Sequence, residues 1–208
     1  EVENGLRKVT KKSLESIVDR FVPVREAAIA EDVDIALAAA AAIRIVCAHR
    51  LGAFGVEEWN HLINEKLLDD SSTLTPGQIV IKTRNDVANG LANGDSGIVV
   101  QPEPDGPLSF AFRRGPDVLT KPTSAVDDIE MAFATTVHKA QGSEFGTVIV
   151  VVPPKSSPLC TRELLYTAAT RAKPNLILIG NRQDVLHAVE TERPRFSGLV
   201  ERLCQPLT

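Results

Sequence analysis

The sequence predicts an α/β fold in which a parallel sheet is interrupted by a β-rich insertion. Short β-branched runs at 43–48, 147–152 and 176–180 alternate with helical stretches, which is typical of a parallel sheet covered by helices. Between about 71 and 128 the pattern changes to short alternating runs separated by Pro and Gly. The chain has 208 residues, enough for one large domain or two small ones.

The first third of the chain predicts helical structure on either side of a buried strand. Residues 24–42 contain an alanine run and no Pro or Gly, which favours a helix, interrupted or continuous. The run "IRIVCA", 43–48, is short and β-branched, as expected of a buried parallel strand. In "GVEEWNHLINEKLL" the apolar residues recur at helical spacing and predict an amphipathic helix. They are Val56, Trp59, Ile63 and Leu67.

The middle of the chain predicts a small antiparallel barrel. The runs "GQIVIKT", "DSGIVVQ" and "LSFAFR" are short strand patterns separated by turn signals. Asn93, Gly94 and Asp95 form one such signal, and we expect a turn there with Gly94 at positive φ.

The last third resumes the α/β pattern with two strands and two helices. The strands are predicted at 147–152 and 176–180, and the helices at 161–173 and 182–190. Thr161 is suited to cap the first of these helices, and Pro174 is expected to end it.

Composition and charge exclude several classes of protein. No apolar run approaches the roughly 20 residues that span a bilayer, so no membrane partner is expected. Cys47, Cys160 and Cys204 are far apart without C-x-x-C spacing, so we expect neither disulfides nor a metal site, and a reducing cytoplasm fits best. The net charge of -4 limits any nucleic-acid contact to a local groove. Because residue 1 is Glu rather than Met, we expect a piece of a longer polypeptide.

A polar run directly before the strand at 147–152 is the first candidate site. In open α/β sheets ligands gather where strands and loops end, so this position favours a binding site. Its side chains fall into two groups, with donors for phosphates at Thr136, His138 and Lys139, and groups suited to a sugar or nucleotide at Gln141, Gly142, Ser143 and Glu144. The alternative is a solvated turn whose His and Glu cap neighbouring elements.

Arg171 is the second candidate. At 100° per residue it falls at the border of the apolar stripe of the helix predicted at 161–173, where a guanidinium can be held and aimed at a phosphoryl group. The alternative is a surface salt bridge.

Four segments together resemble superfamily 1 DNA helicases of the RecD type, the 5′-to-3′ branch. "ATTVHKAQGSEF" resembles motif V and "LLYTAATRAK" resembles motif VI of that family. "TRNDVANGLANGDSGIVV" resembles the start of its SH3-like barrel, and "RIVCAHRLGAFGVEEWN" resembles the strand and helix before it. The resemblance covers about 43–204 in the family's order, and the "GSEF" ending favours the RecD subunit of exodeoxyribonuclease V. Ala140 and Ala53 depart from the family pattern, where Ser and Pro are expected.

The resemblance implies a RecA-like motor domain of the P-loop NTPase fold, the second of two. It would occupy 43–71 and 129–208, with an inserted SH3-like β-barrel at 72–128 and a helical segment at 1–42 that leads from the first motor domain.

The resemblance also assigns roles to residues in the two motifs. It implies that Thr136, His138 and Lys139 face single-stranded DNA. It implies that Gln141, Gly142 and Glu144 face ATP, and that Arg171 is the catalytic arginine that reaches the γ-phosphate.

The implied activity is ATP-dependent 5′-to-3′ unwinding of DNA in double-strand break repair and recombination, with RecB and RecC as partners. The chain has no G-x-x-x-x-G-K-[ST] and no convincing Walker B carboxylate, so we expect this piece to be inactive alone. The ligands of the Mg²⁺ that accompanies ATP are expected in the first motor domain. Two alternatives remain: a standalone RecD-like helicase, and a non-catalytic scaffold that binds DNA or subunits.

Overall fold

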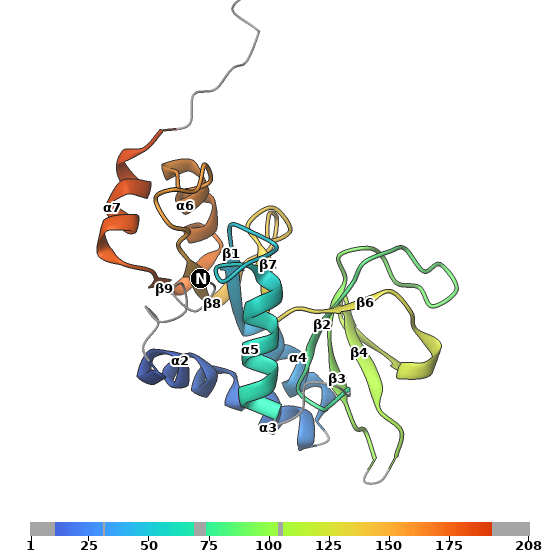
Figure 1. Cartoon of the computed structure of the whole chain (residues 1–208). Coiled ribbons are helices and arrows are strands. Elements are labelled where there is room, and N and C mark those ends of the chain that lie inside the picture. The colour runs from blue at the N-terminus through green and yellow to red at the C-terminus, as the bar shows by residue number, and fades with distance from the viewer. Residues whose placement is uncertain (1–10, 31, 69–73, 104–105, 193–208) are drawn as a thin grey trace, which may run out of the picture.

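The computed structural model describes residues 11–30, 32–68, 74–103 and 106–192, which form two sheets with helices around them (Figure 1). Parts of the predicted segments 1–42, 43–71, 72–128 and 129–208 therefore lie outside the described residues. The helices are α2 (Lys11–Val18), η1 (Asp19–Phe21), α3 (Val22–Ile29), α4 (Val33–Ala42), α5 (Val56–Leu68), η2 (Thr123–Ala125), α6 (Arg162–Ala169) and α7 (Arg182–Glu190). The strands are β1 (Ile43–Cys47), β2 (Ile79–Lys82), β3 (Ser96–Val100), β4 (Ser109–Arg114), β5 (Asp117–Pro122), β6 (Ile129–Met131), β7 (Ala134–Thr136), β8 (Phe145–Val151) and β9 (Ala172–Ile179).

The first sheet is parallel, as the alternating pattern predicts. Its four strands lie in the order β7-β1-β8-β9, and every residue of β1 is buried. Ile45 pairs with Ala134 on one side and with Ile149 on the other. This continuous β-branched interior is what a sheet covered on both faces requires. None of the helices in the described part of the chain is long and apolar enough to cross a membrane.

The second sheet is antiparallel and contains the strands of the β-rich segment. Its order is β5-β4-β3-β2-β6, and Gly94 has a φ of 95°, as the turn prediction requires. Among the described strands no pairing joins β5 to β6, so closure into a barrel stays a prediction. Since β6 is followed almost at once by β7, the chain passes directly from the antiparallel sheet to the parallel one.

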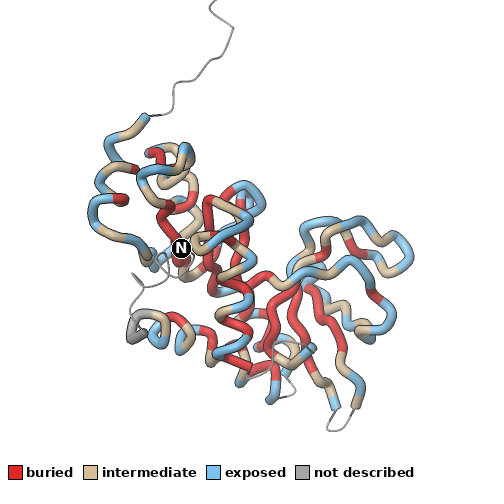
Figure 2. Tube along the Cα trace, viewed as in Figure 1, coloured by how far each residue is buried: buried red, intermediate tan, exposed pale blue. Residues whose placement is uncertain are grey.

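One hydrophobic core extends through both sheets. It includes Ile45 and Ile149 of the parallel sheet, Ile79 and Ile98 of the antiparallel sheet, and Trp59 of α5. Figure 2 shows buried stretches in both sheets. The antiparallel sheet therefore shares one apolar face with the parallel sheet, while a separate cluster that includes Val99 and Phe112 lies within the antiparallel segment.

A second cluster covers the opposite face of the parallel sheet. Val46, Val148 and Val150 pack there against Ala168 of α6. Val137 and Ala140 join the same cluster, so the segment that follows β7 is anchored to the sheet by its apolar side chains.

The predicted helix at 161–173 is wrong in its last four residues. Helix α6 begins after Thr161, whose side chain accepts a hydrogen bond from Leu164 N as predicted, but it ends at Ala169. Strand β9 then begins at Ala172 and pairs in parallel with β8, so strand pairing overrides the helical propensity of "TRAK". Pro174 lies inside this strand, where it is tolerated because β9 is at the edge of the sheet.

Asn60 of α5 fixes the point at which the chain passes between the two sheets. Its side chain is buried, its amide nitrogen donates to Met131 O at 2.9 Å, and its oxygen accepts from Ala134 N at 2.7 Å. One side chain thus satisfies backbone groups at the end of β6 and at the start of β7.

We expect Asn60→Ala to lower the free energy of unfolding by about 1 to 3 kcal/mol, because it leaves buried backbone groups without partners. Urea unfolding followed by circular dichroism measures this. The neighbouring His61→Ala is the control, since that side chain is 56% exposed and its loss is expected to stay within about 0.5 kcal/mol. Equal losses of unfolding free energy for the two variants would contradict the role assigned to Asn60.

Candidate functional site

The polar run occupies a loop, 137–144, that leads from the carboxyl end of β7 to the amino end of β8. Thr136 is the last residue of β7 and pairs with Cys47, the last residue of β1, which also pairs with Val151 at the end of β8. Phe145, where the loop ends, is the first residue of β8. Six residues of strand separate the two positions, about 20 Å at the usual rise. The first predicted group of polar residues therefore starts at the carboxyl end of β7, and the second group finishes at the amino end of β8.

The first end of the loop holds Thr136, His138 and Lys139 in a tight turn. Lys139 N donates to Thr136 Oγ1 at 3.2 Å, and Ala140 N donates to Thr136 O at 3.0 Å. Val137 and Ala140 point into the core, whereas His138 and Lys139 are exposed. The apolar residues hold the turn on the sheet, so the side chains of His138 and Lys139 lie on its exposed side.

The second end of the loop meets Arg171. Gly142 has a φ of 87°, a conformation that favours glycine, and it turns the chain toward β8. Arg171 Nη1 donates to Ser143 O at 3.3 Å, and Phe145 N donates to Arg171 O at 2.9 Å. Arg171 is not on a helix, contrary to the prediction, but in the turn between α6 and β9. It is half-buried, and its guanidinium bonds only to neutral acceptors within the described residues.

Glu144 completes this end of the loop. Its carboxylate accepts from Lys173 Nζ at 2.9 Å, and this bond, with the charges of Lys173 and Arg171, lowers the pKa of Glu144 below its ordinary value. Lys173 is not among the predicted site residues. The pairing of Phe145 with Ala172 is what brings it beside Glu144, and no local sequence signal indicates that register.

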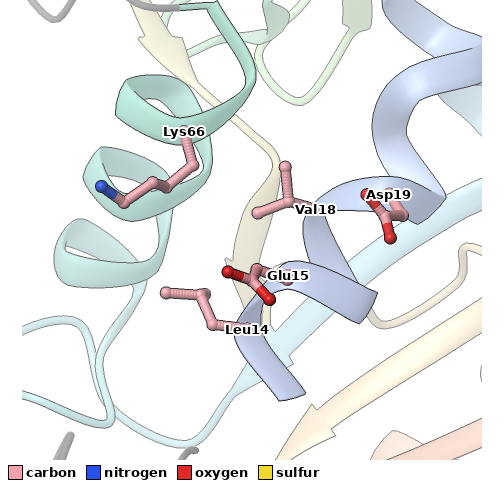
Figure 3. A pocket seen from close by; sticks show the side chains of 5 residues that line it. All are labelled: Leu14, Glu15, Val18, Asp19 and Lys66. Atoms are coloured by element: carbon pink, nitrogen blue, oxygen red, sulfur yellow. The ribbon is translucent and has the colours of Figure 1, made fainter. Parts of the chain in front are cut away.

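A hollow of about 130 Å³ lies between the loop and α6. His138 and Gln141 of the loop line it together with residues at the start of α6: Thr161, Glu163, Leu164 and Thr167. A larger hollow of about 370 Å³ lies between α2 and α5, lined by Leu14, Glu15, Val18, Asp19 and Lys66 (Figure 3). It contains none of the predicted site residues, and we place the site at the smaller hollow because two of them, His138 and Gln141, line it.

Metal ligands do not gather in the described part of the chain. No three His, Cys, Asp or Glu side chains lie close enough there to hold an ion. The loop and Arg171 offer one carboxylate, Glu144, which is already paired with Lys173. The described residues therefore do not form a magnesium site.

Comparisons with known proteins agree on one family. Residues 131–179 match the model of the UvrD-like helicase C-terminal domain. The chain is 37% identical over 194 residues to the RecBCD enzyme subunit RecD of Mycolicibacterium smegmatis, covering 91% of this chain and 34% of that protein. It is 35% identical over 129 residues to the ATP-dependent RecD2 DNA helicase of Deinococcus radiodurans, covering 62% of this chain and 18% of that protein.

The fold is also found among solved structures. The chain superposes on the Pif1 helicase from Bacteroides in complex with ADP-AlF3 and single-stranded DNA with a TM-score of 0.50 and 17% identity, over 97% of this chain and 52% of that one. This likeness shows the fold alone. The chain spans about a third of the length of the RecD proteins that it matches.

Proposed function

We propose, from the premise that this chain is the C-terminal domain of a RecD-type helicase, that it supplies one half of an ATP-driven DNA motor. The single observation that carries this proposal is the loop 137–144. Its first end displays His138 and Lys139 beside the last residue of β7, and its second end meets Arg171 beside the first residue of β8. One loop can thus transmit a change from a nucleotide to a DNA strand.

On the nucleotide side, Arg171 is proposed to reach the γ-phosphate of ATP. Gln141, Gly142 and Glu144 would complete this half of the cleft, because they lie on the same stretch of loop. The phosphate cradle and the magnesium ligands would come from a segment outside this chain, which is why the chain alone is proposed to be inactive. An arginine supplied in this way stabilises the charge that develops on the transferred phosphoryl group.

On the DNA side, Thr136, His138 and Lys139 are proposed to bind the backbone of single-stranded DNA. Closure around ATP would draw the second end of the loop toward the nucleotide and shift the first end along the strand, giving translocation in the 5′-to-3′ direction. The antiparallel sheet would act as an SH3-like insert at about 72–128 that guides or separates strands.

We expect His138→Ala to weaken single-stranded DNA binding about tenfold, the effect of losing one hydrogen bond to a charged group. Fluorescence anisotropy with labelled oligo(dT) measures this in the full-length polypeptide. His61→Ala is the matched control, because His61 is an exposed histidine on α5 outside the loop. The DNA role of the loop would be refuted by equal dissociation constants for the two variants.

The partners RecB and RecC are proposed from the names of the RecD relatives, together with a cytoplasmic role in break repair. A standalone helicase is the second candidate, and the similarity to RecD2 favours it. Co-purification of the native polypeptide separates the two. Recovery with two large subunits supports the complex, and recovery alone supports the standalone enzyme.

A further inference from the structure

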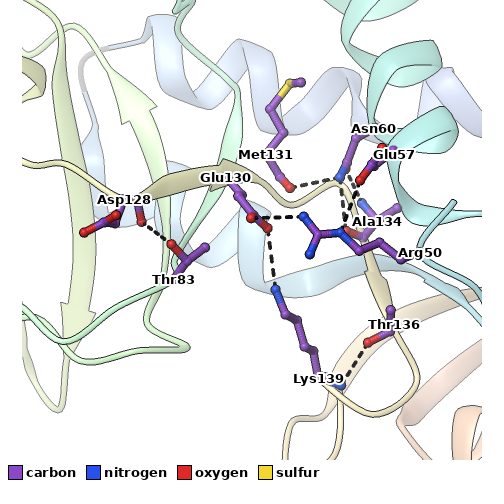
Figure 4. Close-up of polar contacts among 10 residues, drawn as sticks. All are labelled: Arg50, Glu57, Asn60, Thr83, Asp128, Glu130, Met131, Ala134, Thr136 and Lys139. Atoms are coloured by element: carbon purple, nitrogen blue, oxygen red, sulfur yellow. Dashed lines mark hydrogen bonds and ion pairs between the residues drawn. The ribbon is translucent and has the colours of Figure 1, made fainter.

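Three charged side chains from three different elements converge beside the DNA-facing end of the loop (Figure 4). Arg50 Nη2 lies 3.4 Å from Glu130 Oε1, and Lys139 Nζ lies 3.5 Å from Glu130 Oε2. Arg50 follows β1 and Lys139 follows β7, so both cations stand at the same edge of the parallel sheet. Glu130 comes from β6 of the antiparallel sheet.

Each oxygen of the Glu130 carboxylate meets one cation, which is also how two non-bridging oxygens of a phosphate are bound. A guanidinium and an ammonium are the side-chain groups that most often bind phosphates. The Arg50 guanidinium is oriented by a further contact, since its Nε donates to Glu57 Oε1 at 3.1 Å, and the backbone of Lys139 is held by the bond from its N to Thr136 Oγ1 at 3.2 Å. The pair is therefore arranged to hold an oxyanion.

An anion from solution can replace the Glu130 carboxylate. The side chains of Arg50, Glu130 and Lys139 are 64%, 46% and 51% exposed, so an anion in solution can reach the two cations. Ion pairs at such exposure contribute little to stability, and a ligand that offers a stronger oxyanion can replace one partner.

We propose that Arg50 and Lys139 form a binding site for one backbone phosphate of single-stranded DNA, and that the Glu130 carboxylate occupies this site in the free protein. The inference rests on the proposed function, because Thr136, beside the site, is part of the proposed DNA track. Displacement of Glu130 would free a side chain of β6, so DNA at this position would act directly on the antiparallel sheet. Glu130 is thus an autoinhibitory contact as well as a link between the two sheets.

The test is the dissociation constant of oligo(dT) measured against salt concentration in the full-length polypeptide. We expect Glu130→Gln to tighten binding about fivefold, since the competing charge is lost. Arg50→Gln is expected to weaken binding and to reduce the log-log salt slope by about 0.7, the value for one lost phosphate contact on a single strand. In a protein that already carries Arg50→Gln, the gain in oligo(dT) affinity from Glu130→Gln is expected to be smaller.

Glu65→Gln is the control, because it removes the same charge from an exposed site on α5 that is bridged to His61 and Lys66. If Glu130→Gln and Glu65→Gln have the same effect while His138→Ala still weakens binding, the phosphate site is overturned and the proposed function stands. If the unmodified protein does not bind oligo(dT) at all, both are overturned.

Discussion

Replacement of Arg171 by alanine is expected to lower ATP turnover about 10³-fold or more, while single-stranded DNA binding stays within about twofold. The physical reason is that a guanidinium at the γ-phosphate stabilises charge that exists only as the phosphoryl group transfers. The turn proposed to bind DNA is held by Thr136 and by the burial of Val137 and Ala140, none of which depends on Arg171. Steady-state hydrolysis in the full-length polypeptide, with saturating oligo(dT), measures the effect.

Two control variants separate the catalytic effect from a loss of local structure. Arg171→Lys keeps the charge but removes the planar fork, so its activity is expected to stay far below that of the unmodified protein. Thr170→Ala removes only the hydroxyl that accepts from Arg171 Nη2 at 3.2 Å, and it is expected to keep most activity. Near-normal hydrolysis by Arg171→Ala would contradict the assignment of this residue to ATP.

The second large effect, on the free energy of unfolding, is expected from replacement of Arg44. This side chain joins the two sheets and the end of the loop. This side chain is buried, donates to Ala132 O and to Ser96 Oγ at 3.2 Å, and lies 5.2 Å from the ring of Phe145. Within the described residues it has no carboxylate partner, and burial lowers its pKa to about 10. The charged guanidinium of Arg44 is therefore stabilised by neutral acceptors and by the face of an aromatic ring.

We expect Arg44→Ala to lower the free energy of unfolding by about 2 to 5 kcal/mol, because it leaves a cavity and buried acceptors without donors. Urea unfolding measures the change. Arg113→Ala is the matched control, since Arg113 is 40% exposed and its ion pair with Asp34 is expected to contribute at most about 1 kcal/mol. A loss at Arg44 no larger than that at Arg113 would contradict the role we assign to it.

The parts of the fold that local patterns determine could be predicted from the sequence. Strand β1 and helices α5 and α7 follow from β-branched runs and from apolar residues at helical spacing. The antiparallel sheet follows from turn residues such as Gly94. These signals come from residues close in the sequence, and they predict the structure correctly because tertiary packing favours the same elements.

The features that depend on strand register could not be predicted. The end of α6 was placed four residues late because the pairing of Ala172 with Phe145 has no local signal. The same register brings Lys173 to Glu144, and the return of the chain through β6 brings Glu130 to Arg50. The shared core of the two sheets is likewise a tertiary property, which the change of pattern near residue 71 conceals.

The proposed function depends on coupling, through the loop 137–144, between a nucleotide at one end of the loop and DNA at the other. Its most direct test is the affinity for oligo(dT) in the presence and absence of a non-hydrolysable ATP analogue, in the full-length polypeptide. We expect the analogue to change the dissociation constant by about fivefold or more, and Arg171→Ala to abolish this change. The same dissociation constant with and without the analogue in the unmodified protein would contradict the coupling.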